Sequence, residues 1–186
     1  SFRADEEYFQ TLKCMINDMV KSADVPPNHI LGVGVSLPAL LGDDGRVLTY
    51  APLLEGSLDL YQDLKAYIDY SYRFINDANA GGFAELCCGQ IGKNALYLLL
   101  SNTVGGAIIM DGKLYRGEGG RGGEFGHMTL VPDGRPCYCG KRGCGDAYCS
   151  ALLLSNVTGG DLEKFFQKLE QGDDKCREVW EEYLHY

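Results

Sequence analysis

Apolar residues recur with helical spacing near the start of the chain and then give way to a short β-branched run. From Asp5 to Ala23 they fall three and four residues apart, which predicts an amphipathic helix. Pro26 and Pro27 end this helix. The apolar stretch from Ile30 to Leu37 predicts a buried strand, and a short extended segment is expected from Val47 to Tyr50.

The next segment has the order strand, polar turn, helix. Ser57 is a suitable N-cap for a helix whose apolar face runs from Leu60 to Ile68. A strand is expected from Tyr72 to Ile75, and the polar turn at residues 76–79 then leads into a helix that ends near Gly89. This order is typical of an α/β sheet.

Three further strands and a group of helices make up the rest of the pattern. The strands are expected at Asn94 to Leu100, Gly105 to Met110 and Lys113 to Tyr115, the last two joined by a tight turn at Asp111-Gly112. A glycine-rich loop follows at residues 117–126. One helix is predicted from Ala147 to Ser155, and two more between Asp161 and the C-terminus.

Composition and charge narrow the functional classes. With 186 residues, 45% of them hydrophobic, the chain can bury a core. No apolar run approaches the roughly 18 residues of a membrane span, and no secretory signal layout opens the chain, so we expect a cytoplasmic protein without a membrane partner. The net charge of −9 repels polyanions, which argues against direct nucleic-acid binding by this segment.

Three cysteines and a histidine are grouped on one glycine-containing stretch. His127, Cys137, Cys139 and Cys144 offer one imidazole and three thiolates, the ligands of a closed structural zinc site. Gly134, Gly140 and Gly143 allow the bends that would let these side chains converge. Two alternatives are incidental cysteines on a loop and a nucleic-acid zinc knuckle, and the net acidity weighs against the second.

The stretch from Gly122 to Ser150, GGEFGHMTLVPDGRPCYCGKRGCGDAYCS, resembles the signature of the ROK family of sugar kinases and sugar-responsive repressors. INDANAGGFAE at residues 75–85 and GGAIIMDGKLYRG at residues 105–117 resemble two further family segments, in the same order. The resemblance implies an α/β fold of the actin-like, ribonuclease-H-like ATPase type, with two lobes, a sugar between them and a zinc-binding loop insertion. Residues 1–91 would be the remainder of the N-terminal lobe, and residues 92–186 part of the C-terminal lobe with its zinc loop at 127–144.

The resemblance also implies roles for single residues. Asp77 would be the general base toward a sugar hydroxyl, with Asn76 orienting the sugar; alternatively, the two only cap the following helix. Glu124 would accept hydrogen bonds from the sugar, unless it is a solvated loop acid. His127 would ligate zinc with one ring nitrogen and reach the sugar with the other. Asp146 stands where the family usually has glutamate, which would shorten this sugar contact by one methylene.

The chain departs from the family's kinases at the phosphate loop. Their Gly-Thr-Gly is replaced by Ser101-Asn102-Thr103, and only Gly105 and Gly106 remain of the glycines. The opening phosphate hairpin of the family, Asp-x-Gly-Gly-Thr, is also absent, and Ser1 is not an initiator methionine, so we expect an incomplete, middle piece of the fold. Added Cβ atoms would occupy the space that phosphate oxygens need.

Three functions remain open from the sequence. The first is the sugar-binding core of a ROK transcriptional regulator, whose DNA-binding domain would lie outside this chain. The second is an ATP-dependent kinase of a hexose or N-acetylhexosamine, and only this function requires ATP and Mg²⁺. The third is an oligomerisation module, since the family commonly forms homo-oligomers.

Overall fold

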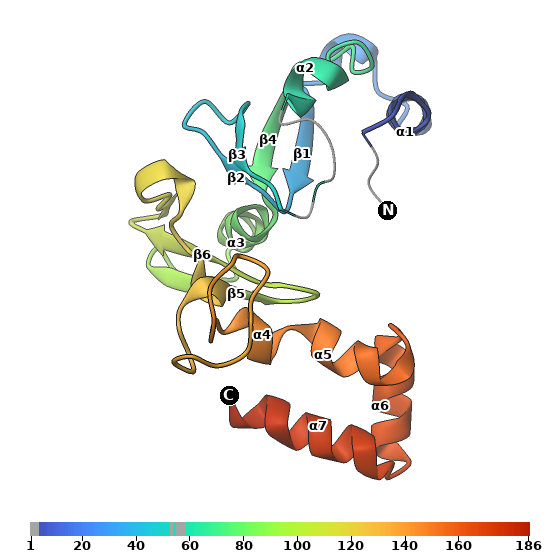
Figure 1. Cartoon of the computed structure of the whole chain (residues 1–186). Helices are drawn as coiled ribbons and strands as arrows, with labels where there is room; N and C mark the ends of the chain where they lie inside the picture. The colour runs from blue at the N-terminus through green and yellow to red at the C-terminus, as the bar shows by residue number, and fades with distance from the viewer. Residues whose placement is uncertain (1–3, 53, 55–58) are drawn as a thin grey trace. The chain divides into compact units, whose positions relative to one another are not determined.

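The chain forms two compact units (Figure 1). The computed structural model describes residues 4–52, 54 and 59–186. One unit consists of residues 1–80 and 117–121, and the other of residues 81–116 and 122–186. The lobe boundary expected between residues 91 and 92 stays a prediction.

The first unit is built around a parallel strand pair. It contains α1 (Glu6–Ser22), β1 (Val33–Leu37), β2 (Leu40–Leu41), β3 (Leu48–Tyr50), α2 (Leu60–Leu64), β4 (Tyr72–Asn76) and the start of α3 (Asp77–Cys87). β1 pairs with β4 from Val33 opposite Tyr72 to Leu37 opposite Asn76, while β2 and β3 form an antiparallel pair. The connection between parallel strands needs a crossover, and α2 lies within it.

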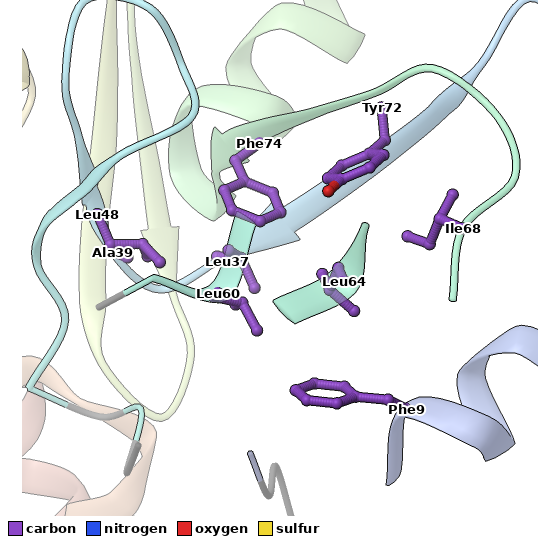
Figure 2. Packing of buried hydrophobic residues seen from close by; sticks show 9 residues of the cluster. All are labelled: Phe9, Leu37, Ala39, Leu48, Leu60, Leu64, Ile68, Tyr72 and Phe74. Atoms are coloured by element: carbon purple, nitrogen blue, oxygen red, sulfur yellow. The ribbon is translucent and has the colours of Figure 1, made fainter. Parts of the chain in front are cut away.

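The core of this unit draws buried residues from α1, β1, β3, α2 and β4 (Figure 2). Its buried members are Phe9, Leu37, Ala39, Leu48, Leu60, Leu64, Ile68, Tyr72 and Phe74. Phe9 comes from α1, and its ring lies 5.3 Å from that of Tyr67. The core therefore holds α1 and α2 together with the β1–β4 pair, and burial of these side chains stabilises the unit.

The predicted elements of the first unit are confirmed with changes at their ends. Asp5 caps α1, since its carboxylate accepts a hydrogen bond from the Tyr8 backbone N–H at 2.8 Å. The first strand starts at Val33 rather than Ile30, because a 3₁₀ turn at Pro27–His29 precedes it and the Leu31 side chain is 98% exposed. The helix expected to reach Ile68 ends at Leu64, and its predicted N-cap, Ser57, lies outside the described residues.

The second unit combines an antiparallel sheet with helices. It contains β5 (Ala95–Leu100), β6 (Val104–Met110), β7 (Lys113–Leu114), α4 (Asp146–Cys149), α5 (Ala151–Ser155), α6 (Leu162–Glu170) and α7 (Asp174–His185), together with the end of α3. The strands lie in the order β5-β6-β7. As expected, Asp111 and Gly112 form the tight turn, both with positive φ.

Two packing contacts hold the second unit together. α3 approaches the sheet through glycines: a Cβ on Gly82 would lie 2.7 Å from the Ala107 Cβ, and one on Gly81 would lie 2.6 Å from the Tyr97 hydroxyl. The C-terminal helices pack around buried Leu154, Phe165 and Cys176. Within the described part of the chain, no helix is long and apolar enough to cross a membrane.

The single helix predicted from Ala147 to Ser155 is wrong. Ser150 has an extended conformation (φ −79°, ψ 144°), and it separates α4 from α5. The backbone N–H of Ala151 donates instead to the carbonyl of Ser101 at 2.7 Å. A tertiary hydrogen bond to the β5–β6 hairpin thus replaces a helical one, which the local sequence pattern does not reveal.

Candidate metal centre and sugar site

The loop with the four predicted metal ligands folds back on itself. Two isolated antiparallel bridges close it, Thr129 with Cys144 and Pro136 with Arg142. In the tip beyond the second bridge, the Cys137 backbone N–H donates to the Lys141 carbonyl at 2.9 Å, and the Gly140 N–H donates to the Cys137 carbonyl at 3.0 Å. This turn places the backbone of Cys137 and Cys139 on one tight bend.

Glycines make these bends possible in two different ways. Gly140 and Gly143 have φ of +87° and +78°, a region that favours glycine. A Cβ on Gly143 would also lie only 1.7 Å from the Val131 carbonyl oxygen. Gly134 does not have a positive φ. It lets the backbone approach Tyr148 closely, because a Cβ at this position would lie 2.1 Å from the Tyr148 hydroxyl.

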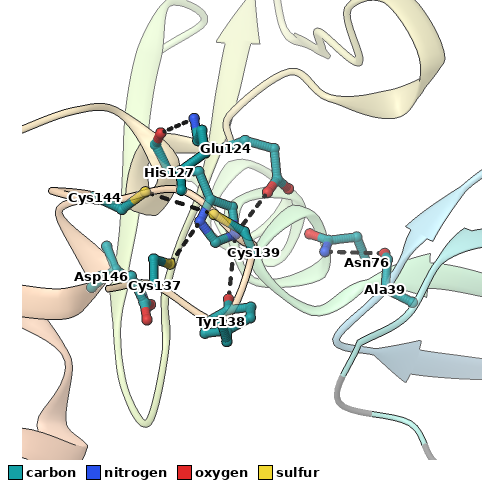
Figure 3. A network of polar contacts seen from close by, with 11 residues as sticks. Ala39, Asn76, Glu124, His127, Cys137, Tyr138, Cys139, Cys144 and Asp146 are labelled. Carbon is teal, nitrogen blue, oxygen red and sulfur yellow. Dashed lines mark hydrogen bonds and ion pairs between the residues drawn. The ribbon is translucent and has the colours of Figure 1, made fainter. Parts of the chain in front are cut away.

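The four side chains converge (Figure 3). Their ligand atoms all lie within 4.8 Å of one another. The Cys137 Sγ lies 3.7 Å from the His127 Nδ1, and the Cys139 Sγ lies 3.7 Å from the Cys144 Sγ. A tetrahedral zinc ion with ordinary bond lengths separates sulfur from nitrogen by about 3.6 Å and sulfur from sulfur by about 3.8 Å.

Disulfide bonding is excluded for these cysteines. All eight cysteines are free, and a disulfide would require sulfur atoms about 2.05 Å apart. The arrangement is therefore a metal-binding geometry of one imidazole and three sulfurs, with Cys144 fully buried.

The thiols differ in acidity in the metal-free chain. Burial raises the pKa of Cys137 to about 12, and it raises that of Cys144 as well. Burial also acts on Cys139, but the Lys141 backbone N–H and the neighbouring thiols outweigh it, so the pKa of Cys139 is lowered. Three such close thiolates repel one another, and a bound cation removes that repulsion.

The outer ring nitrogen of His127 faces away from the sulfur atoms. Nε2 lies 3.8 Å from the Glu124 Oε2 and 3.3 Å from the Tyr138 hydroxyl. The Lys141 ammonium donates to the His127 carbonyl at 2.7 Å, which fixes the backbone beside the ring. The structure therefore places Glu124 next to the predicted metal ligand, with Nδ1 toward the sulfurs and Nε2 toward polar groups (Figure 3).

Asp146 is buried, and its carboxylate points to the backbone of the hairpin. Its Oδ1 accepts a hydrogen bond of 2.5 Å from the Val104 N–H. The pKa of this carboxyl is raised, because the effect of burial outweighs the Val104 hydrogen bond and the nearby His127, which both lower it. One carboxylate oxygen is thus committed within the protein, and the sugar contact predicted for Asp146 stays a prediction.

The predicted phosphate loop is a closed hairpin turn. Leu100 pairs with Val104, and the three residues between them form the turn. Thr103 accepts at its carbonyl from the Ser101 N–H at 3.2 Å and from the Ser101 hydroxyl at 3.4 Å. The retained Gly106 has a packing role, because a Cβ there would lie 2.2 Å from the Phe125 ring, and Gly105 pairs with Leu99 in the sheet.

Asn76 and Asp77 belong to the first unit, at the end of β4. The Asn76 Oδ1 accepts from the Asn79 N–H at 3.0 Å, and its Nδ2 donates to the Ala39 carbonyl at 3.3 Å (Figure 3). The Asp77 Oδ1 accepts from the Ala78 N–H at 2.9 Å. Both side chains therefore bind the first turn of α3, a role that is compatible with a second one toward a sugar.

The sequence interpretation overlooked Tyr138. The signal was present, since this tyrosine stands between two ligand cysteines in the Cys-x-Cys segment. Only the folded loop shows that its ring lies edge-on to the His127 imidazole, with centroids 5.2 Å apart.

This fold and this Cys/His centre define a known family. The ROK family model matches residues 2–186, and the chain belongs to the ROK family. It is 32% identical over 148 residues to the xylose repressor of Bacillus subtilis strain 168, which covers 77% of this chain and 38% of the repressor. It is also 32% identical over 152 residues to the N-acetylmannosamine kinase of Escherichia coli O157:H7, covering 76% of this chain and 52% of the kinase.

A solved structure agrees with the fold. A ROK family glucokinase from Streptomyces griseus, in complex with glucose and AMPPNP, superposes with a TM-score of 0.77 at 24% identity. The match covers 96% of this chain and 64% of the glucokinase. The predicted actin-like, ribonuclease-H-like α/β fold is confirmed. The chain spans about two fifths to one half of the length of the repressor and kinase that it matches.

Proposed function

We propose that this chain is the sugar-binding core of a ROK-type transcriptional regulator. The observation that carries the proposal is that backbone N–H groups of the β5–β6 hairpin are already hydrogen-bonded within the chain. The N–H groups of Ser101 and Val104 are both used within the chain, the second by the Asp146 carboxylate. A phosphate-binding loop needs free backbone N–H groups and no nearby anion, so this hairpin suits a protein that does not bind nucleotide.

A sensor needs only part of the family's machinery. It must bind its sugar more tightly in one conformation than in another, and this difference in affinity shifts the population. It needs no phosphate donor. The resemblance to xylose repressors at 32% identity supports this function.

The sugar contacts that we propose are those implied by the family resemblance: Asn76, Asp77, Glu124, His127 and Asp146. The second-unit members of this set are supported by their grouping, since Glu124 lies 3.8 Å from the outer nitrogen of His127. Carboxylates and a neutral imidazole suit a polyhydroxylated ligand, because sugar hydroxyls both donate and accept hydrogen bonds.

We assign zinc to the Cys/His centre. His127, Cys137, Cys139 and Cys144 would hold it, since their chemistry and separations fit a closed tetrahedral site. Four protein ligands leave no position for substrate, so the ion would serve as a cross-link. The chain's own residues do the rest: the braced loop holds the His127 ring, and with it the neighbouring Glu124, in one orientation.

An ATP-dependent sugar kinase is the second candidate, favoured by the kinase relatives and by Asp77. In that function the Asp77 carboxylate would accept the proton of the attacking sugar hydroxyl, and Asn76 would orient the sugar. Its second carboxylate oxygen suits such a role, because only Oδ1 is used in the bond to Ala78 that begins α3. ATP and Mg²⁺ would be cofactors only in this case.

Calorimetry distinguishes the two candidates. The protein is titrated with D-xylose, D-glucose and N-acetyl-D-mannosamine, and separately with Mg-ATP, while ADP release is followed by a coupled assay. We expect sugar binding without micromolar affinity for Mg-ATP and without turnover. Micromolar Mg-ATP binding, or sugar-dependent ADP release that Asp77→Asn abolishes, would establish the kinase instead.

We further propose a cytoplasmic homo-oligomer, whose contact with DNA would be made by a domain outside this chain. The free cysteines favour a reducing compartment. The net charge of −9 disfavours direct DNA contact by this segment. Light scattering with and without sugar tests the assembly.

A further inference from the structure

Tyr138 lies beside the outer nitrogen of His127, and the proposed function gives this tyrosine no role. It lies between Cys137 and Cys139, two of the proposed metal ligands, which would fix its backbone on both sides when a metal is bound. Its hydroxyl lies 3.3 Å from the His127 Nε2, and its ring stands edge-on to the imidazole at 76° (Figure 3). The residue nevertheless remains 45% exposed. The residue is therefore both in contact with His127 and accessible at the surface.

A proton on the His127 Nε2 leaves the Tyr138 hydroxyl hydrogen available for donation to a ligand. When the Nδ1 of His127 binds a metal, the neutral imidazole carries its proton on Nε2 and donates from there. The Tyr138 oxygen and a sugar oxygen can share this donor in a three-centre bond. A phenol is both donor and acceptor and is protonated at neutral pH, so its own O–H then points away from the ring nitrogen.

Glu124 supplies the complementary group. Its Oε2 lies 3.8 Å from the same Nε2, so this nitrogen has an acceptor and a donor as neighbours. A sugar hydroxyl needs both, because its hydrogen donates to one group while its oxygen accepts from another. Glu124 and Tyr138 thus offer an acceptor and a donor at the same ring nitrogen of His127.

We infer that Tyr138 is a further sugar-binding and specificity-determining residue, whose O–H donates to the oxygen of one sugar hydroxyl while the Glu124 carboxylate accepts that hydroxyl's hydrogen. This inference rests on the proposed sugar-binding function. A purely structural Tyr138, which only steadied the metal ligand His127, would change metal retention and would not distinguish among sugars.

The test compares Tyr138→Phe with the wild type and with a matched control, Tyr115→Phe. Tyr115 lies in the same unit and is 50% exposed, and it is not among the site residues. Dissociation constants are measured by calorimetry for the tightest-binding sugar of D-xylose, D-glucose and N-acetyl-D-mannosamine, and for its monodeoxy analogues. Zinc per chain is measured on the same samples by mass spectrometry.

Tyr138→Phe is expected to weaken binding of the parent sugar about three- to tenfold, as the loss of one neutral hydrogen bond does. Zinc content and the Tyr115→Phe affinity should not change. One monodeoxy analogue, which lacks the recognised hydroxyl, should bind equally to the wild type and to Tyr138→Phe.

Two results would overturn the inference while leaving the proposed function intact. One is equal affinity of the wild type and Tyr138→Phe for the parent sugar. The other is loss of zinc from Tyr138→Phe, which would assign the hydroxyl to the metal centre. A wild-type protein that binds none of the three sugars would instead refute the proposed function, and this inference with it.

Discussion

The sharpest test of the metal-binding loop compares alanine at its two positive-φ glycines. At Gly140 no atom lies within 4 Å of an added Cβ, so Gly140→Ala meets only the cost of the left-handed backbone, about 1–2 kcal/mol. At Gly143 the Cβ would lie 1.7 Å from the Val131 carbonyl oxygen. That oxygen accepts the Gly134 N–H at 3.0 Å, and the Gly143 N–H donates to the Arg135 carbonyl at 2.8 Å.

Relieving this clash must separate the two strands of the loop and break these hydrogen bonds. At about 1 kcal/mol each, their loss brings the expected destabilisation by Gly143→Ala to about 3–4 kcal/mol. Because the same loop positions Cys144, zinc affinity should fall as well, by a similar free energy.

Urea unfolding of the zinc-loaded variants measures the first effect, and competition with a chromogenic chelator measures the second. Gly140→Ala serves as the control, since it has the same backbone requirement without the clash. If the two variants lost equal stability, within about 0.5 kcal/mol, the close approach of residue 143 to the Val131 carbonyl would not be what requires glycine there.

Three further changes have defined outcomes. Gly106→Ala should lose about 1–3 kcal/mol by overpacking against Phe125, whereas Gly92→Ala, in open space, should be nearly neutral in the same urea titration. Arg135→Ala should cost about 1 kcal/mol, because the half-exposed pair with Glu182 is weak, and a double-mutant cycle with Glu182→Ala should return most of that as coupling. As the pH is lowered, zinc affinity should fall about tenfold per pH unit for each proton that is released on binding. Burial raises the pKa of Cys137 and Cys144 in the metal-free chain, so these thiols are protonated before zinc binds. A flat profile in a chelator competition between about pH 8 and 6 would contradict this.

The sequence was sufficient where the chemistry is local. Helical spacing from Asp5 to Ala23 predicts α1, and Asp111-Gly112 predicts its tight turn, because these features depend on neighbouring residues. The sequence also predicted that three cysteines and a histidine come together, because few other uses place them among glycines at this spacing; their role as metal ligands stays a prediction.

Only the tertiary structure decided how distant side chains are used. The Asp146 carboxylate binds Val104, 42 residues away, and Ala151 donates to Ser101, which breaks the predicted helix. The position of the His127 Nδ1 beside the Cys137 sulfur likewise depends on where the loop returns. Periodicity and motif spacing describe what a segment can do by itself, but a hydrogen bond between remote segments depends on the path of the whole chain, which no local pattern records.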